Sequence, residues 1–237
     1  MGQMIEFPRP DGASAPGYLA LPEHPDAAPG IVLIEEWWGV NEQIKGIAER
    51  YAEHGYRTLV PDLFRGRVAA DGTEAKHLMS GLDFADAASQ DVRGSALHLR
   101  RKGGRVGVTG YCMGGALAIL AAMHVTEIDA AVSFYGYPPA DAGDPATIRI
   151  PLLCHAATHD AFFPIAGYEE IERKMKAAGL PVELLRYDAK HAFSNPTPPP
   201  RGLGNYQADL ANLAWSKTLD FWSRTIGVRR GSLSVNG

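Results

Sequence analysis

Two glycines flank a cysteine where a strand is expected to turn into a helix. The stretch Gly110–Gly115 reads GYCMGG, with the β-branched run Arg105–Thr109 before it and the small apolar residues Ala116–Ala122 after it. A nucleophile in such a sharp turn needs small neighbours, and its side chain then projects above the carboxyl edge of a sheet. The N-terminus of the next helix would also favour a thiolate at Cys112. The pattern indicates nucleophilic catalysis.

The same stretch has two other interpretations. Free cysteines are often buried, so Cys112 could be a core residue beside a tight glycine turn. Glycine-rich turns also bind phosphate, but the sequence contains neither GxGxxG nor GxxxxGK[ST]. Residues elsewhere in the chain must decide between these alternatives.

A carboxylate and a histidine follow in the order that a catalytic triad at this turn requires. The acid is expected after a later strand and the histidine after the last one. The strand Pro151–His155 is followed by Asp160, and the strand Val182–Tyr187 is followed by His191. We therefore predict a triad in which Cys112 attacks, His191 is the general base and acid, and Asp160 orients it.

The elements that would position these side chains alternate between strands and helices. The expected strands are 17–21, 30–34, 57–60, 105–109, 129–134, 151–155 and 182–187. The expected helices are 41–54, 73–101 with weak points at Gly81 and Gly94, 113–124, 164–178 and 206–226. This alternation predicts an α/β fold: a mostly parallel sheet with helices on both faces, in a single domain over residues 1–237.

Composition narrows the class of protein. The 237 residues carry a formal net charge of −4, and no basic stripe suggests a nucleic-acid partner. The longest apolar run, 116–123, is too short to span a membrane. The first residues do not resemble a signal peptide, so we expect a cytoplasmic monomer or weak homodimer. A disulfide between Cys112 and Cys154 would be unusual in the cytoplasm. The sequence has no CxxC or HExxH motif, so we expect no metal and no cofactor.

The chain resembles the dienelactone hydrolase family over about residues 17–224. The stretches that carry the resemblance are Glu36–Asn41 (EWWGVN), Pro61–Leu63, Gly110–Gly115, His159–Asp160 with Pro164, and Lys190–Phe193. Cysteine in place of serine in the turn is the more specific mark of the family. The resemblance implies an α/β-hydrolase fold and a small-molecule ester or lactone, cleaved by a Cys-His-Asp triad through a thioester acyl-enzyme.

The resemblance also implies roles beside the triad. The backbone N–H groups of Met113 and Trp37 would hold the oxyanion. In the family, a glutamate at the position of Glu36 engages the resting thiol and is displaced by substrate; its charge would raise the pKa of the thiol. Glu36 could instead be a solvated loop carboxylate, and Glu35 is an equal candidate by residue type. The place directly before Trp37 favours Glu36.

The substrate contacts depart from the family pattern. The aromatic residues expected to line the acyl pocket include Trp38, Tyr135 and Phe162. Family members that cleave dienelactones grip the substrate carboxylate with two arginines, one of them four residues after the catalytic histidine. That position is Asn195 here, and no arginine lies between Arg67 and Arg93. Arg201 could substitute from a Pro-rich loop. We therefore expect a neutral substrate.

Two other functions remain open from the sequence. A non-catalytic ligand receptor could use the same fold, although the intact nucleophile, base and acid argue against it. A redox role for Cys112, as a peroxidatic or sensor thiol, would need no Asp160. Turnover of lactones or aryl esters by the wild-type chain, and its loss in Cys112→Ala, would separate these functions from hydrolysis.

Overall fold

An eight-stranded sheet forms the centre of the computed structural model, which describes residues 2–228. The strands are β1 (Gln3–Pro8), β2 (Ser14–Ala20), β3 (Gly30–Ile34), β4 (Arg57–Pro61), β5 (Val106–Tyr111), β6 (Ala130–Phe134), β7 (Leu152–Ala157) and β8 (Val182–Tyr187). Their order is β1-β2-β4-β3-β5-β6-β7-β8. The pairs β1–β2 and β2–β4 are antiparallel, and the others are parallel. The expected mostly parallel sheet is confirmed.

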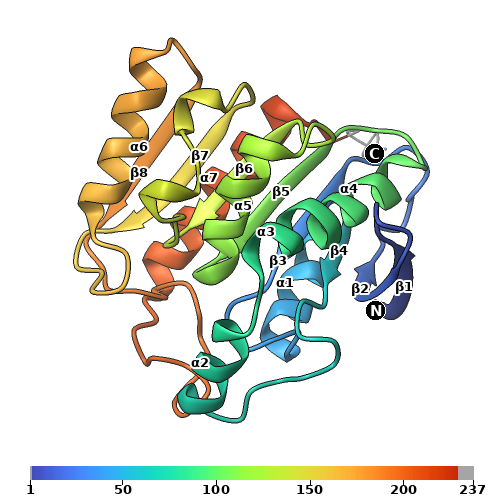
Figure 1. The fold of residues 1–237 in the computed structure, drawn as a ribbon, viewed down its shortest axis with the longest axis horizontal. Coiled ribbons are helices and arrows are strands. Elements are labelled where there is room, and N and C mark those ends of the chain that lie inside the picture. Colours follow the sequence, from blue (N-terminus) through green and yellow to red (C-terminus); the bar gives the residue numbers. More distant parts are fainter. Residues whose placement is uncertain (1, 229–237) are drawn as a thin grey trace, which may run out of the picture.

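Helices cover both faces of this sheet (Figure 1). They are α1 (Glu42–Glu53), α2 (Gly72–Ser80), α3 (Phe84–Asp86), the π-helical segment η1 (Ala87–Val92), α4 (Arg93–Arg100), α5 (Met113–His124), the short turns η2 (Ala140–Ala142) and η3 (Pro145–Thr147), α6 (Ile165–Ala177) and α7 (Ala208–Thr225). One apolar core packs α4, α5 and α6 against the sheet, and the other packs α1 and α7 against the opposite face. The central strands β3, β5 and β6 are therefore fully buried.

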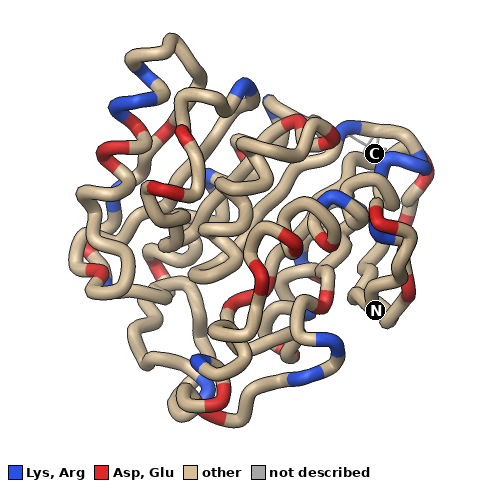
Figure 2. Tube along the Cα trace, viewed as in Figure 1, with Lys and Arg blue, Asp and Glu red and all other residues tan. Residues whose placement is uncertain are grey.

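The positions of the charged side chains follow from this layering. Lys, Arg, Asp and Glu of both signs lie along the helices and loops, and β3, β5 and β6 carry none (Figure 2). Within residues 2–228, no helix combines the length and the apolar character needed to cross a bilayer.

The predicted elements and the observed ones differ at β1 and within the helix expected over 73–101, and the short turns η2 and η3 were not predicted either. The strand β1 was not expected, because its alternating pattern is weak and it lies at the edge of the sheet. The predicted break at Gly81 is confirmed, since α2 ends there. Gly94 is not a break: it lies inside α4, where a Cβ would come within 2.9 Å of the carbonyl oxygen of Pro8. This glycine serves the close approach of α4 to β1 rather than the end of a helix.

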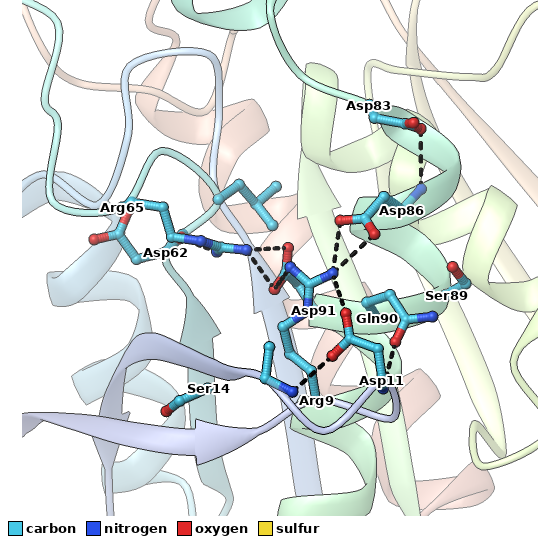
Figure 3. A network of polar contacts seen from close by, with 12 residues as sticks. Arg9, Asp11, Ser14, Asp62, Arg65, Asp83, Asp86, Ser89, Gln90 and Asp91 are labelled. Atoms are coloured by element: carbon cyan, nitrogen blue, oxygen red, sulfur yellow. Dashed lines mark hydrogen bonds and ion pairs between the residues drawn. The ribbon is translucent and has the colours of Figure 1, made fainter.

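An ion-pair network ties the first hairpin to η1 (Figure 3). Arg9 follows β1 and lies 2.8 Å from Asp86 and 3.5 Å from Asp91. Arg65, in the loop after β4, donates to both oxygens of Asp91 at 2.9 Å. Asp91 is only 1% exposed, and a carboxylate so deeply buried needs charged partners. The network fixes the loop after β4, which leads into α2 beside the site described next.

Candidate active site

Cys112 occupies the tight turn between β5 and α5, with a φ of 55°. Such a left-handed backbone is costly for a residue with a Cβ, so packing must hold it in place. A Cβ on Gly110 would clash with the carbonyl of Gly114, and one on Gly114 would lie 2.5 Å from the carbonyl oxygen of Ile34. The two glycines therefore let the turn press against β3, as the G-x-C-x-G pattern predicts.

His191 and Asp160 form a hydrogen bond between the ends of two neighbouring strands. His191, after β8, donates from Nδ1 to Oδ2 of Asp160, after β7, at 2.7 Å. The other carboxylate oxygen, Oδ1, accepts from the backbone N–H groups of Phe162 at 2.8 Å and Phe163 at 2.9 Å. Both members of the pair are buried. Since Asp160 is fixed by the backbone, it fixes the orientation of the His191 ring.

A cavity of about 170 Å³ brings these groups together. Its lining residues are Glu36, Trp37, Trp38, Met79, Cys112, Met113, Phe162, Phe163, His191, Ala192, Asn195 and Leu203. Its walls are mainly aromatic and aliphatic, and the lining that the structure describes includes a carboxylate but no lysine or arginine. A thiol and an imidazole therefore meet in an apolar pocket that carries no fixed positive charge.

Burial controls the protonation of the thiol. Burial, and then the negative charges of Glu36 and Asp160, raise the pKa of Cys112 well above its usual range, while a hydrogen bond from the backbone N–H of Met113 lowers it in part. Glu36 is itself only 4% exposed, and its burial raises its pKa against the effects of His191 and two hydrogen bonds. The resting cysteine is thus a thiol rather than a thiolate.

Two side chains from distant loops hold the Glu36 carboxylate. Tyr135, after β6, donates its hydroxyl to Oε1 at 3.3 Å. Asn195, after β8, donates Nδ2 to Oε2 at 2.5 Å, and its Oδ1 accepts from the backbone N–H of Thr197 at 2.9 Å. Because the backbone N–H of Thr197 can only donate, it fixes Oδ1 toward Thr197 and leaves the NH₂ end of the Asn195 amide facing Glu36. Both carboxylate oxygens are thus engaged by the protein.

The residues predicted to contact substrate fall into two groups. Trp38, Phe162 and Asn195 line the cavity, whereas Tyr135 and Arg201 are not among its lining residues. Tyr135 is fully buried, and its hydroxyl reaches the glutamate from outside the cavity. Arg201 is exposed in the loop before α7.

The other predicted site residues lie around the thiol. Met113 and Trp37 both line the cavity. Of the two adjacent glutamates, Glu36 lines it, while Glu35 is fully buried on another side and accepts from the backbone N–H of Leu63 at 3.2 Å. The carboxylate beside the thiol is therefore Glu36.

Four lining residues were not predicted from the sequence. They are Met79, Phe163, Ala192 and Leu203. Phe163 could have been found as the neighbour of Phe162, and Ala192 as the neighbour of His191. Met79 lies on α2 and Leu203 in the loop before α7, and no local pattern marks either of them.

Residues 15–226 match the model of the dienelactone hydrolase family. The chain belongs to this family. Like the other members, it is an α/β-hydrolase that cleaves ester or lactone bonds, so the predicted fold and enzyme class are confirmed. Among residues 2–228, no three His, Cys, Asp or Glu side chains gather closely enough to hold a metal ion.

Relatives of this family member cover nearly its whole length. "Protein usf" of Aquifex pyrophilus is 33% identical over an alignment of 235 positions, which covers 94% of this chain and 98% of that protein. A "Putative carboxymethylenebutenolidase" of Aquifex aeolicus (strain VF5) is 30% identical, over 82% of this chain and 88% of that protein. A crystal structure titled "Putative Dienelactone Hydrolase", from Klebsiella pneumoniae, has a TM-score of 0.82 at 26% identity, covering 94% of this chain and 98% of that one.

Removing the charge of Glu36 should make Cys112 more reactive. In Glu36→Gln the nearby negative charge is gone, so the pKa of the thiol falls and the thiolate fraction at neutral pH rises, by about tenfold for each pKa unit. The rate of alkylation by iodoacetamide, followed by mass spectrometry, should rise accordingly. Glu35→Gln is the matched control and should leave the rate unchanged. Equal rates in wild type and Glu36→Gln would remove Glu36 from control of the thiol.

Proposed function

We propose that this enzyme hydrolyses a neutral ester or lactone through Cys112 and a thioester acyl-enzyme. The observation that carries the proposal is the 2.7 Å bond between His191 Nδ1 and Asp160 Oδ2, in a pair that meets Cys112 at one cavity. An ionised Asp160 can only accept, so Nδ1 keeps the proton and Nε2 is left free to accept one. Nucleophile, base and orienting acid then have the roles of a triad.

The first half of the reaction forms the thioester. His191 takes the thiol proton as Cys112 attacks the carbonyl carbon, and it gives that proton to the departing alkoxide. The oxyanion would accept from the backbone N–H groups of Met113, at the start of α5, and Trp37. The hydrogen bond from Met113 that lowers the thiol pKa supports this direction of its N–H. In the second half, His191 activates a water that cleaves the thioester.

Substrate choice follows from the charges around the cavity. Asn195 stands where dienelactone-cleaving members carry an arginine. Its amide already donates to Glu36 and accepts from the backbone N–H of Thr197. It therefore has little left to offer a substrate carboxylate. Glu36 adds a buried negative group to the same cavity. A substrate carboxylate brought into this pocket would lose water without gaining a cation.

We expect uncharged esters or lactones to be preferred over their carboxylated analogues. A missing charge-assisted hydrogen bond is worth roughly 1.5–3 kcal/mol, so kcat/KM should differ by about tenfold or more. The measurement is kcat/KM for a pair of lactones or aryl esters that differ only in one carboxylate.

Arg201→Ala tests the competing source of positive charge. The variant should barely affect neutral substrates, because Arg201 is exposed and outside the cavity lining. If the wild type turns over the anionic analogue well and Arg201→Ala selectively abolishes that turnover, the preference for neutral substrates is wrong.

A further inference from the structure

A second cavity lies on the other side of the loop that follows β8. Its volume is about 430 Å³, and it is bounded by α1, α7 and the loop residues Ser194 and Pro196–Pro198. Adjacent residues of this loop line different cavities: Asn195 lines the one with Cys112, and Ser194 lines the other. The proposed mechanism gives the second cavity no role.

Hydrogen bonds connect the two cavities through one buried tyrosine. The Tyr135 hydroxyl lies 2.9 Å from Ser194 Oγ and 3.3 Å from Glu36 Oε1. Tyr135 is fully buried and has a φ of 36°, a strained value for a residue with a large side chain. Strain of this kind persists only where surrounding contacts impose it, and it clusters at functional sites. The strained backbone therefore holds the hydroxyl between Glu36 and the second cavity.

This chain of groups can be polarised in either direction. When Glu36 is ionised, Tyr135 donates to it and accepts from Ser194. When Glu36 is protonated, it can donate to Tyr135, which donates to Ser194, which donates to solvent in the second cavity. A complete reversal moves one proton from Glu36 to that solvent.

We propose that Tyr135 and Ser194 form a proton path from Glu36 to the second cavity, which lets the active site release a proton while substrate fills the first cavity. The proposal rests on the proposed function, since the proton comes from the Cys112 thiol. A proton path is needed most with aryl esters whose leaving group departs as a phenolate. Such a leaving group takes up no proton, so the thiol proton must leave the protein.

The step conserves protons and charge. The S–H bond of Cys112 breaks as His191 takes its proton, and the N–H bond on His191 Nε2 then breaks as an O–H bond forms on Glu36, which lines the same cavity. Glu36 then gives a proton to the Tyr135 oxygen as Tyr135 gives its own to Ser194, and Ser194 gives its own to a water molecule. Glu36 is again a carboxylate and both hydroxyls are neutral. His191 is neutral again, ready to activate the water that cleaves the thioester.

The test compares proton release with acylation. Wild type and variants are mixed rapidly with 4-nitrophenyl acetate in weak buffer at mildly alkaline pH. The nitrophenolate burst reports acylation, and an indicator dye that absorbs away from nitrophenolate reports the proton. Ser194→Val and Ser194→Thr are nearly isosteric, and only threonine keeps the hydroxyl. Asn212→Ala changes the same cavity outside the proton path and is the control.

In wild type, Ser194→Thr and Asn212→Ala, proton release should keep pace with the nitrophenolate burst. In Ser194→Val and Tyr135→Phe it should lag by about a hundredfold, the lower end of the effect of removing one proton-transfer group. Proton release that keeps pace in Ser194→Val would overturn the path while leaving the proposed function intact. A wild-type enzyme that gives no burst at all would instead overturn the proposed function, and the path with it.

Discussion

Replacing Cys112 with alanine is expected to lower kcat by about four orders of magnitude or more, because the variant has no group that can form the thioester. The measurement is the initial rate on an aryl ester that the wild type turns over. Mass spectrometry of the quenched reaction should find an acyl adduct on the wild-type chain and none on Cys112→Ala. The adduct should map to the peptide that contains residues 110–115.

The second cysteine supplies the control for this prediction. Cys154 lies in β7, is 1% exposed and does not line the cavity, and burial raises the pKa of its thiol. Cys154→Ser should therefore keep its turnover, even if the buried hydroxyl lowers its stability. Activity that survives in Cys112→Ala and disappears in Cys154→Ser would show that the nucleophile is wrongly assigned.

The protonation of Cys112 also bears on a redox role. Thiolates are oxidised far more readily than thiols, and sensor cysteines have low pKa values. Burial and the charge of Glu36 act in the opposite direction here. We therefore expect the resting thiol to resist oxidation, and the proposed mechanism needs a thiolate only when substrate is bound.

The sequence predicts the strand-to-helix turn well because its conformation depends on local chemistry. The small residues Gly110 and Gly114 are needed at fixed distances from Cys112, and this requirement is visible as G-x-C-x-G. The places of Asp160 and His191 could also be predicted, since a parallel sheet brings the carboxyl ends of its strands to one edge. Local turn chemistry and chain order together suffice for these three side chains.

The surroundings of Glu36 could not be predicted in the same way. Its partners Tyr135 and Asn195 are 99 and 159 residues away in the sequence, and their bonds depend on how three loops pack. From the sequence both residues were expected to contact substrate. Tyr135 follows a strand, where pockets form, and Asn195 lies four residues after His191, where dienelactone-cleaving relatives carry an arginine. Only the packed structure reveals that they hold a carboxylate instead, and that Ser194 continues the chain of hydrogen bonds.

Changes to the other two members of the proposed triad should each nearly abolish turnover. His191→Ala removes the base outright. In Asp160→Asn, Oδ1 can still accept from the backbone N–H groups of Phe162 and Phe163, so the amide nitrogen would take the place of Oδ2 and donate to His191. The imidazole proton would then sit on Nε2, which could no longer accept the thiol proton. Each loss in kcat should be about four orders of magnitude.

The double variant distinguishes a triad from independent contributions. Groups that act in one proton transfer are strongly non-additive, so His191→Ala with Asp160→Asn should be little slower than the worse single variant. His159→Ala is the matched control, because His159 neighbours the acid but is exposed and bonded to Asp188. Its kcat should stay near that of wild type. If the losses of His191→Ala and Asp160→Asn multiply in the double variant, Asp160 does not act through His191, and the 2.7 Å bond between them has a structural role instead.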